Sequence, residues 1–183
     1  KLLFRCETMQ AFTLAVEICE DLWAPLPPST AHALAGATVL ANLSASDETV
    51  GKAEYRRALV SQQSARLLCA YLYADAGHGE STTDMVFSGH SLIAENGALL
   101  AESRPFSQAL ACTELDLGRL LAERRRNTSF EPVTDGYETV SFHLPLREIP
   151  LTRYISPTPF VPADGGARAE RCERILQMQA DGL

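Results

Sequence analysis

Cys19 is the side chain in this sequence that is best placed for nucleophilic chemistry. Residues 13–19 alternate between two kinds of side chain with a period of two, which predicts a strand, and the proline-rich residues 25–28 predict a loop soon after it. A cysteine at such a strand end can expose its sulfur beside free backbone N–H groups, which can stabilise a developing oxyanion. Free cysteine is also among the most often buried residue types, so a purely structural Cys19 is the alternative interpretation.

Strands and helices alternate along the part of the chain that has to position Cys19. Apolar runs and turn residues predict strands at 13–19, 37–43, 67–74, 85–87, 91–94, 98–102 and 109–115. Periodicity and capping residues predict helices at 29–34, 52–66, 117–126 and 166–180. This order of elements predicts an α/β layered sandwich.

The second half of the sequence supplies a turn and a boundary. Asn96-Gly97 predicts a tight hairpin, because both residue types readily take positive φ in a type I′ turn. After Asn127 the prolines at 145, 150, 157, 159 and 162 break the chain and the periodicity fades, so we expect an extended connector that ends in the terminal helix. The predicted organisation is therefore a main domain at 1–126 and a linker with its helix at 127–183.

Several motifs carry a resemblance to a known family. The stretch Val16-Glu-Ile-Cys-Glu-Asp-Leu-Trp23, followed by Pro27-Pro-Ser29, resembles the nucleophile segment of the nitrilase superfamily, and most closely that of the glutaminase domains of glutamine-dependent NAD synthetases. Further stretches resemble the same family in the same order: Ala35-Gly-Ala37, Asn42-Leu-Ser-Ala-Ser46, Gly51-Lys-Ala-Glu-Tyr-Arg-Arg57, Gln63-Ser-Ala-Arg66, Gly79-Glu-Ser-Thr-Thr-Asp84, Glu95-Asn-Gly97 and Pro159-Phe-Val-Pro162. The resemblance implies the carboxyl-terminal part of a nitrilase-like α-β-β-α sandwich, incomplete at its amino-terminal side.

The resemblance also implies an activity. In that family a Glu-Lys-Cys triad cleaves the side-chain amide of L-glutamine: the cysteine attacks the amide carbon, ammonia leaves, and water releases glutamate from the thioester. Cys19 matches the nucleophile, and the backbone N–H of Glu20 is a candidate oxyanion donor. Ser46 and Lys52 match positions that hold the substrate, a task that suits a hydroxyl and a cation. A helix cap for Ser46 and a solvated helix position for Lys52 are the alternatives.

The family's Glu and Lys both precede the nucleophile in sequence. Upstream of Cys19 this chain has Lys1 and Glu7, which lie in no matching motif, and Glu17, which is too close to act as an independent base. We therefore expect the isolated fragment to lack the catalytic Glu and Lys and to have little or no glutaminase activity. In the family the terminal helix leads into a synthetase domain, for which ATP and magnesium are expected; no cofactor is expected for this fragment.

Composition argues against several other classes. The 183 residues carry a net charge of −7, which disfavours a nucleic-acid partner because phosphate binding needs clustered Lys and Arg. No run approaches the roughly 20 apolar residues that cross a bilayer, so no membrane partner is expected. Five scattered cysteines fit a reducing cytoplasm, and four dispersed histidines give no support to a zinc site.

Two other functions stay open at this point. One is a nitrilase-type amidohydrolase that acts on another amide, although the long match at 42–57 favours glutamine. The other is a non-catalytic assembly domain in which Cys19 is merely buried. Because sandwiches of this type commonly pair face to face, a homo-oligomer is expected, with the chain's own synthetase domain as a further partner.

Overall fold

The computed structural model describes residues 1–182, which fall into two compact units. The first unit, Lys1–Pro150, is built on one seven-stranded sheet in the order β6-β5-β4-β3-β2-β1-β7. Its strands are β1 (Leu2–Cys6), β2 (Thr13–Ile18), β3 (Val39–Ser44), β4 (Ala70–Asp75), β5 (Leu92–Glu95), β6 (Ala98–Glu102) and β7 (Glu138–Phe142). Its helices are the 3-10 helix η1 (Cys19–Trp23), α1 (Pro28–Leu34), α2 (Lys52–Leu67) and α3 (Leu117–Arg126).

The parallel strands β2, β3 and β4 form the centre of this sheet. Leu14 of β2 pairs with Val39 of β3, which pairs with Ala70 of β4. β1 is antiparallel to β2 and parallel to β7, whereas β4, β5 and β6 are mutually antiparallel. Because parallel strands run in one direction, β2, β3 and β4 end at the same edge, and the loops that follow them meet there.

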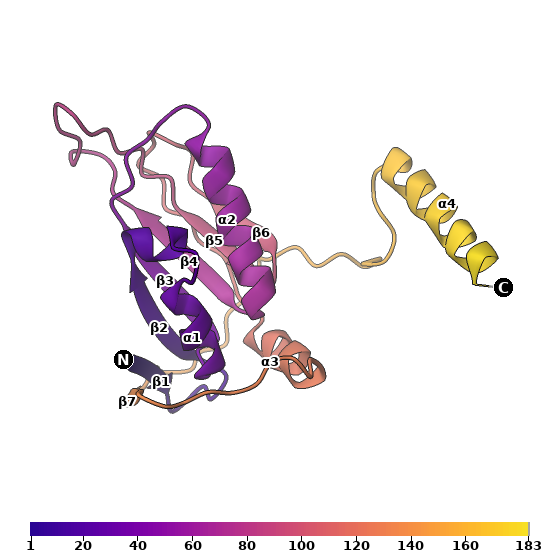
Figure 1. The fold of residues 1–183 in the computed structure, drawn as a ribbon, viewed down its shortest axis with the longest axis horizontal. Coiled ribbons are helices and arrows are strands. Elements are labelled where there is room, and N and C mark those ends of the chain that lie inside the picture. Colours follow the sequence, from indigo (N-terminus) through magenta and orange to yellow (C-terminus); the bar gives the residue numbers. More distant parts are fainter. Residues whose placement is uncertain (183) are drawn as a thin grey trace. The chain divides into compact units, whose positions relative to one another are not determined.

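Helices α1 and α2 cover one face of the sheet (Figure 1). Ala33 of α1 and Val60 of α2 pack with Leu40 and Tyr71 of the strands in the main hydrophobic core. Burial of such side chains at about 25 cal/mol per Å² is the dominant stabilising contribution to this layer. The core therefore fixes the backs of the strands whose ends carry the polar loops.

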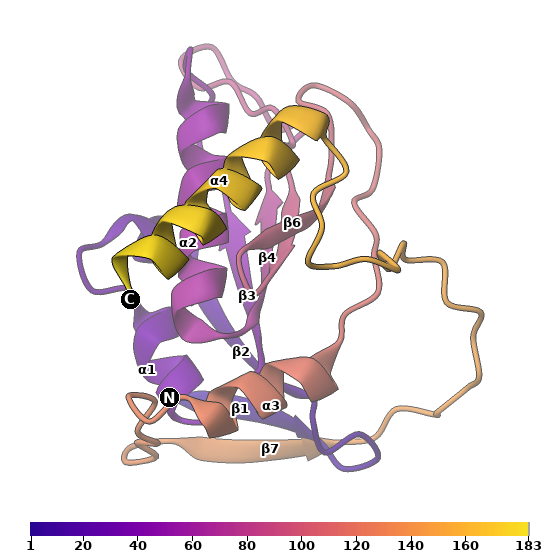
Figure 2. The ribbon, with the colours of Figure 1, turned by 90° about the vertical axis from the view of Figure 1, so that its right-hand side faces the viewer.

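The opposite face of the sheet is only partly covered. Leu120 of α3 packs against Val39 and Ala70 where the central strands begin (Figure 2). At the other ends of the strands the same face is open, since Ile18 and Leu43 are 56% and 55% exposed. Residues 1–182 thus form the predicted mixed α/β layer, but the strands among them make one sheet rather than the two of an α-β-β-α sandwich.

The helices and the hairpin follow the predictions from the sequence closely. Each of the four α-helices begins and ends within one residue of its predicted bounds, and Asp116 caps α3 by accepting a hydrogen bond from the Arg119 amide at 2.9 Å. Asn96 and Gly97 have φ of 47° and 86°, as a type I′ turn between β5 and β6 requires. Local signals, caps and turn residues were sufficient for these elements.

The strands depart from the predictions where pairing is non-local. Residues 109–115 form no strand, and residues 85–87 contribute only the bridge between Asp47 and Phe87. β1 and β7 were not predicted, and β7 lies inside the stretch expected to be a connector, so the compact unit extends to Pro150. Strand formation depends on cross-strand neighbours more than on propensity, and a partner more than 130 residues away leaves no local signal.

The second unit begins at Leu151 and contains α4 (Gly165–Asp181). Asp164 caps α4 by accepting a hydrogen bond from the Ala167 amide at 2.8 Å, and Arg171 donates to the Phe160 carbonyl at 2.7 Å. No residue of α4 is buried. Across residues 1–182, none of the helices combines the length and the apolar character needed to span a bilayer.

Candidate active site

Cys19 occupies a strained turn at the end of β2. Its φ is +49°, in the left-handed region that costs a non-glycine residue about 1–3 kcal/mol. Asn42 Nδ2 donates to the Cys19 carbonyl at 3.2 Å, and Asp21 Oδ2 accepts from the Ile18 amide at 2.8 Å. Both side chains support the turn, and residues 19–23 form a short 3-10 helix rather than the loop predicted there.

A cavity of about 370 Å³ lies beside this turn, large enough for a small amide substrate. The half-buried Cys19, the exposed Glu20, Ser46 and Lys52 all line it. The remaining lining residues are Trp23, Ala45 and Asp47. The structure therefore brings all four candidate site residues to one cavity, although they are spread over more than 30 positions of the sequence.

Ser46 lies in the loop between β3 and α2 and is 6% exposed. Its backbone N–H donates to Asp75 Oδ1 at 2.9 Å, which ties this loop to the end of β4. The N-cap of α2 is Gly51, with φ of +85°, so Ser46 does not cap that helix. Its place at the cavity wall leaves the hydroxyl suited to hydrogen-bond a bound molecule.

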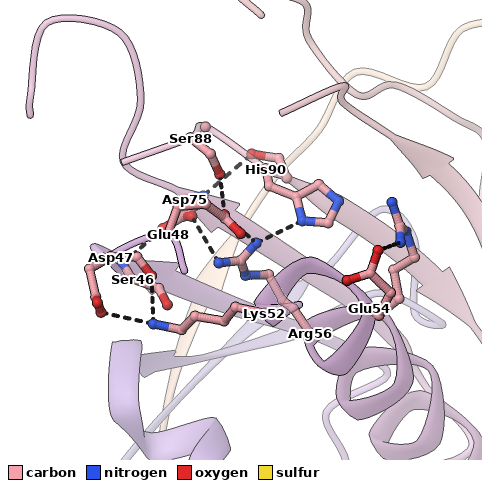
Figure 3. Close-up of polar contacts among 12 residues, drawn as sticks. Ser46, Asp47, Glu48, Lys52, Glu54, Arg56, Asp75, Ser88 and His90 are labelled. Atoms are coloured by element: carbon pink, nitrogen blue, oxygen red, sulfur yellow. Dashed lines mark hydrogen bonds and ion pairs between the residues drawn. The ribbon is translucent and has the colours of Figure 1, made fainter. Parts of the chain in front are cut away.

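Lys52 is held by Asp47 at the same cavity (Figure 3). Its Nζ lies 2.8 Å from Asp47 Oδ1 and 2.6 Å from the Asp47 carbonyl oxygen, and 5.6 Å from the ring centroid of Trp23. The hydrogen bond and charge of Lys52 lower the pKa of the Asp47 carboxyl. Lys52 is thus an engaged, four-fifths-buried cation rather than a freely solvated one.

Trp23 and Asp47 are site residues that the sequence predictions missed. Trp23 stacks on Tyr55 of α2 with ring centroids 5.3 Å apart and an interplanar angle of 27°, and so forms one wall of the cavity. Trp23 is part of the motif Val16–Trp23 that contains Cys19, so its place in that motif could have identified it as a candidate. Asp47 lies five residues before Lys52, and that spacing alone gives no sign of an ion pair.

Glu17 is excluded as a base by its contacts as well as by its position. It is 2% exposed, and its Oε2 accepts from the Ser29 amide at 2.7 Å while Oε1 accepts from the Tyr71 hydroxyl. Burial and the neighbouring Glu17 raise the pKa of Tyr71. The Cys19 thiol is free, and within residues 1–182 it makes no hydrogen bond to another side chain.

The fold places the chain in a known structural class. No protein-family model matches the sequence. Among solved structures, a carbon-nitrogen hydrolase from Helicobacter pylori matches with a TM-score of 0.54 and 20% identity over 65% of this chain and 45% of that one. Nit3 of Saccharomyces cerevisiae, from branch 10 of the nitrilase superfamily, matches with a TM-score of 0.54 and 20% identity over 63% and 42%. The fold is that of the nitrilase, or carbon-nitrogen hydrolase, superfamily.

Sequence comparison identifies relatives of this chain within that structural class. The glutamine-dependent NAD(+) synthetase of Mycobacterium tuberculosis is 45% identical over 193 aligned residues, which cover 100% of this chain, and that of Mycobacterium leprae is 42% identical over the same span. The chain is therefore homologous over its whole length to part of the glutamine-dependent NAD(+) synthetases. It spans 28% of the length of these relatives.

Proposed function

We propose that this chain contributes the nucleophile and the amino-acid-binding wall of a glutaminase site. The observation that carries the proposal is the single cavity lined by Cys19, Ser46 and Lys52. Homology to glutamine-dependent NAD(+) synthetases supports L-glutamine as the substrate. The released ammonia would serve ATP-dependent synthesis of NAD from nicotinic acid adenine dinucleotide, as the family resemblance implies.

The proposed chemistry begins at the sulfur of Cys19. The thiolate adds to the side-chain amide carbon of glutamine, and the resulting oxyanion is stabilised by the backbone N–H of Glu20. The C–N bond then breaks, ammonia leaves after protonation of its nitrogen, and a thioester remains on Cys19. Water cleaves the thioester to give glutamate and the free thiol. Meanwhile Lys52 attracts the α-carboxylate and the Ser46 hydroxyl bonds the amino-acid head group.

The proton transfers need a base and an acid that we assign to residues outside this chain. Glu17 is buried and engaged, and the cavity's other carboxyl groups belong to Glu20 and Asp47, of which Asp47 is paired with Lys52. We therefore propose that the chain works within a longer polypeptide, in line with the length of its relatives, and has little glutaminase activity alone. A synthetase domain using ATP and magnesium, a cytoplasmic location and a homo-oligomer belong to the same proposal.

The test is a labelling and turnover experiment on the full-length protein that contains this chain. A glutamine-mimicking electrophile, such as a diazo ketone with the glutamine skeleton, should label Cys19 alone and abolish glutamate release, and Cys19→Ser should do the same to turnover. Buried Cys69, whose pKa is raised to about 12 by burial, provides an internal negative control. Glutamine turnover that persists in Cys19→Ser would refute the proposal.

The two other functions are outcomes of the same experiment. Faster hydrolysis of an amide without the α-amino acid head, with Cys19 still required, would indicate a different nitrilase-type substrate. A Cys19 that stays unlabelled, together with an assembly that dissociates when this domain is removed, would indicate a non-catalytic assembly domain.

A further inference from the structure

A cluster of charged side chains is centred on the buried Arg56, next to the loop that carries Ser46 (Figure 3). Arg56 follows Lys52 by one turn of α2, and its side chain is 0% exposed. Its Nη1 donates to Glu48 Oε2 at 3.1 Å and lies 2.7 Å from His90 Nδ1, while Nη2 lies 3.8 Å from Asp75 Oδ2. Desolvating a guanidinium costs several kcal/mol unless partners compensate, so these contacts are what keep the charge buried.

Both carboxylates around Arg56 hold the loop that carries Ser46 in place. Glu48 belongs to that loop, and its Oε2 also accepts from the Ser88 hydroxyl at 2.6 Å. Asp75, at the end of β4, accepts the Ser46 backbone N–H through Oδ1 at 2.9 Å. Arg56 therefore touches one carboxylate inside the loop and a second one that binds the loop's backbone.

The third partner of Arg56 anchors the cluster to the far strand. Arg56 can only donate, so His90 Nδ1 is the acceptor and the ring is the neutral tautomer with its proton on Nε2. That Nε2–H donates to Glu102 Oε1 of β6 at 2.6 Å, and the same oxygen accepts from Arg57 Nε at 2.6 Å. α2 is thus fixed to β6 on one side and to the loop on the other, which fixes Lys52 as well because it begins α2.

We propose that Arg56 is a positioning residue that holds Ser46 and Lys52 in the geometry needed to bind the amino-acid head group of glutamine. This inference rests on the proposed function. Arg56 does not line the cavity, so its effect is transmitted through Glu48 and Asp75. A shift of about 1 Å in groups that position a substrate can cost about 100-fold in rate. Because Ser46 and Lys52 are proposed to bind the head group of glutamine, a looser loop should mainly weaken the binding of glutamine.

The experiment compares Arg56→Met and Arg56→Lys with Arg66→Met in the full-length protein. Arg66 lies on the same helix, is exposed, and takes no part in the cluster. We expect Arg56→Met to raise KM for glutamine about 10- to 100-fold while kcat changes at most a few-fold. Arg56→Lys keeps the charge but loses the planar guanidinium, whose Nη1 contacts both Glu48 and His90, so its KM should be intermediate. Arg66→Met should match the wild type.

A labelling readout separates positioning from a merely structural role. Cys19 in the variants should react with iodoacetamide, which has no amino-acid head group, as fast as in the wild type. Its reaction with the glutamine-mimicking electrophile should be slowed about 10-fold or more. Equal slowing of both reagents, or an unchanged KM in folded Arg56→Met, would overturn the inference. If Arg56→Met does not fold, Arg56→Lys gives the same comparison.

The two proposals fail in different ways. A wild-type protein in which the glutamine mimic shows no preference for Cys19 would sink the proposed function. A wild type with that preference, and an Arg56→Lys variant that retains both it and the wild-type KM, would sink only the role of Arg56.

Discussion

Asn42 Nδ2 donates a hydrogen bond of 3.2 Å to the carbonyl oxygen of Cys19. Asn42 lies on β3 and is 0% exposed, and its own Oδ1 accepts from the Ser44 hydroxyl at 2.8 Å. The neighbouring parallel strand therefore stabilises the left-handed turn at Cys19, whose φ of +49° is unfavourable for a residue with a side chain. The nucleophile's geometry depends on β3 as much as on its own strand.

Asn42→Ala should relax this turn. Removing the amide leaves the buried Ser44 hydroxyl without its acceptor, so the free energy of unfolding should fall by about 1–3 kcal/mol. Because the Cys19 turn loses its support, kcat for glutamine in the full-length protein should fall about 10-fold or more with little change in KM. Ser44→Ala, which leaves the bond to Cys19 in place, is the matched control. An Asn42→Ala protein with wild-type kcat would show that the turn needs no such support.

The family resemblance named Cys19, Ser46 and Lys52 as candidate site residues, and the structure brings them to one cavity. The contacts that hold these residues in place could not be predicted from the sequence. The ion pair of Lys52 with Asp47 and the burial of Arg56 depend on side-chain geometry that residue spacing does not encode. For the same reason, the sequence does not distinguish a buried arginine from a solvent-exposed one.

Substitutions of Lys52 and Asp47 should change KM for glutamine in opposite directions. Lys52→Met should raise KM for glutamine about 10- to 100-fold, since a charge-assisted hydrogen bond of about 1.5–3 kcal/mol is lost. Asp47→Asn should lower KM about two- to five-fold, because the competing carboxylate is removed from a partly exposed pair. Steady-state kinetics on both variants measures the difference. A rise in KM for Asp47→Asn would show instead that this carboxylate binds the substrate.

Arg124 is a structural residue, unlike the two arginines that follow it. It is buried, and its guanidinium donates to the carbonyl oxygens of Leu68 at 2.9 Å, Ala37 at 2.7 Å and Leu67 at 3.1 Å. The two leucine carbonyls lie at the end of α2, where helical partners run out. Arg125 and Arg126, by contrast, are exposed.

Arg124→Met should therefore lower the free energy of unfolding by about 2–4 kcal/mol, because several buried carbonyl oxygens lose their donor. Arg125→Met and Arg126→Met, at exposed positions of the same helix, should stay within about 0.5 kcal/mol of the wild type. Urea denaturation of the three variants measures this. Equal effects in all three would mean that Arg124 contributes no more than surface charge.

The buried carboxyl of Asp75 makes stability depend on pH in a direction opposite to that of a typical salt-bridged aspartate. Desolvation raises its pKa, and the charge of Glu48 adds to the rise, against the Ser46 amide and Arg56, which lower it. The folded state therefore binds this proton more tightly than the unfolded state. By linkage, the contribution of Asp75 to stability falls as the pH rises from about 4 through its raised folded pKa.

Asp75→Asn cannot titrate, so the free energy of unfolding of the wild type, relative to this variant, should decline over that interval and then level off. Urea unfolding of both proteins between pH 4 and 8 checks the sign, and a relative stability of the wild type that increases with pH would show that Arg56 outweighs burial at this carboxylate.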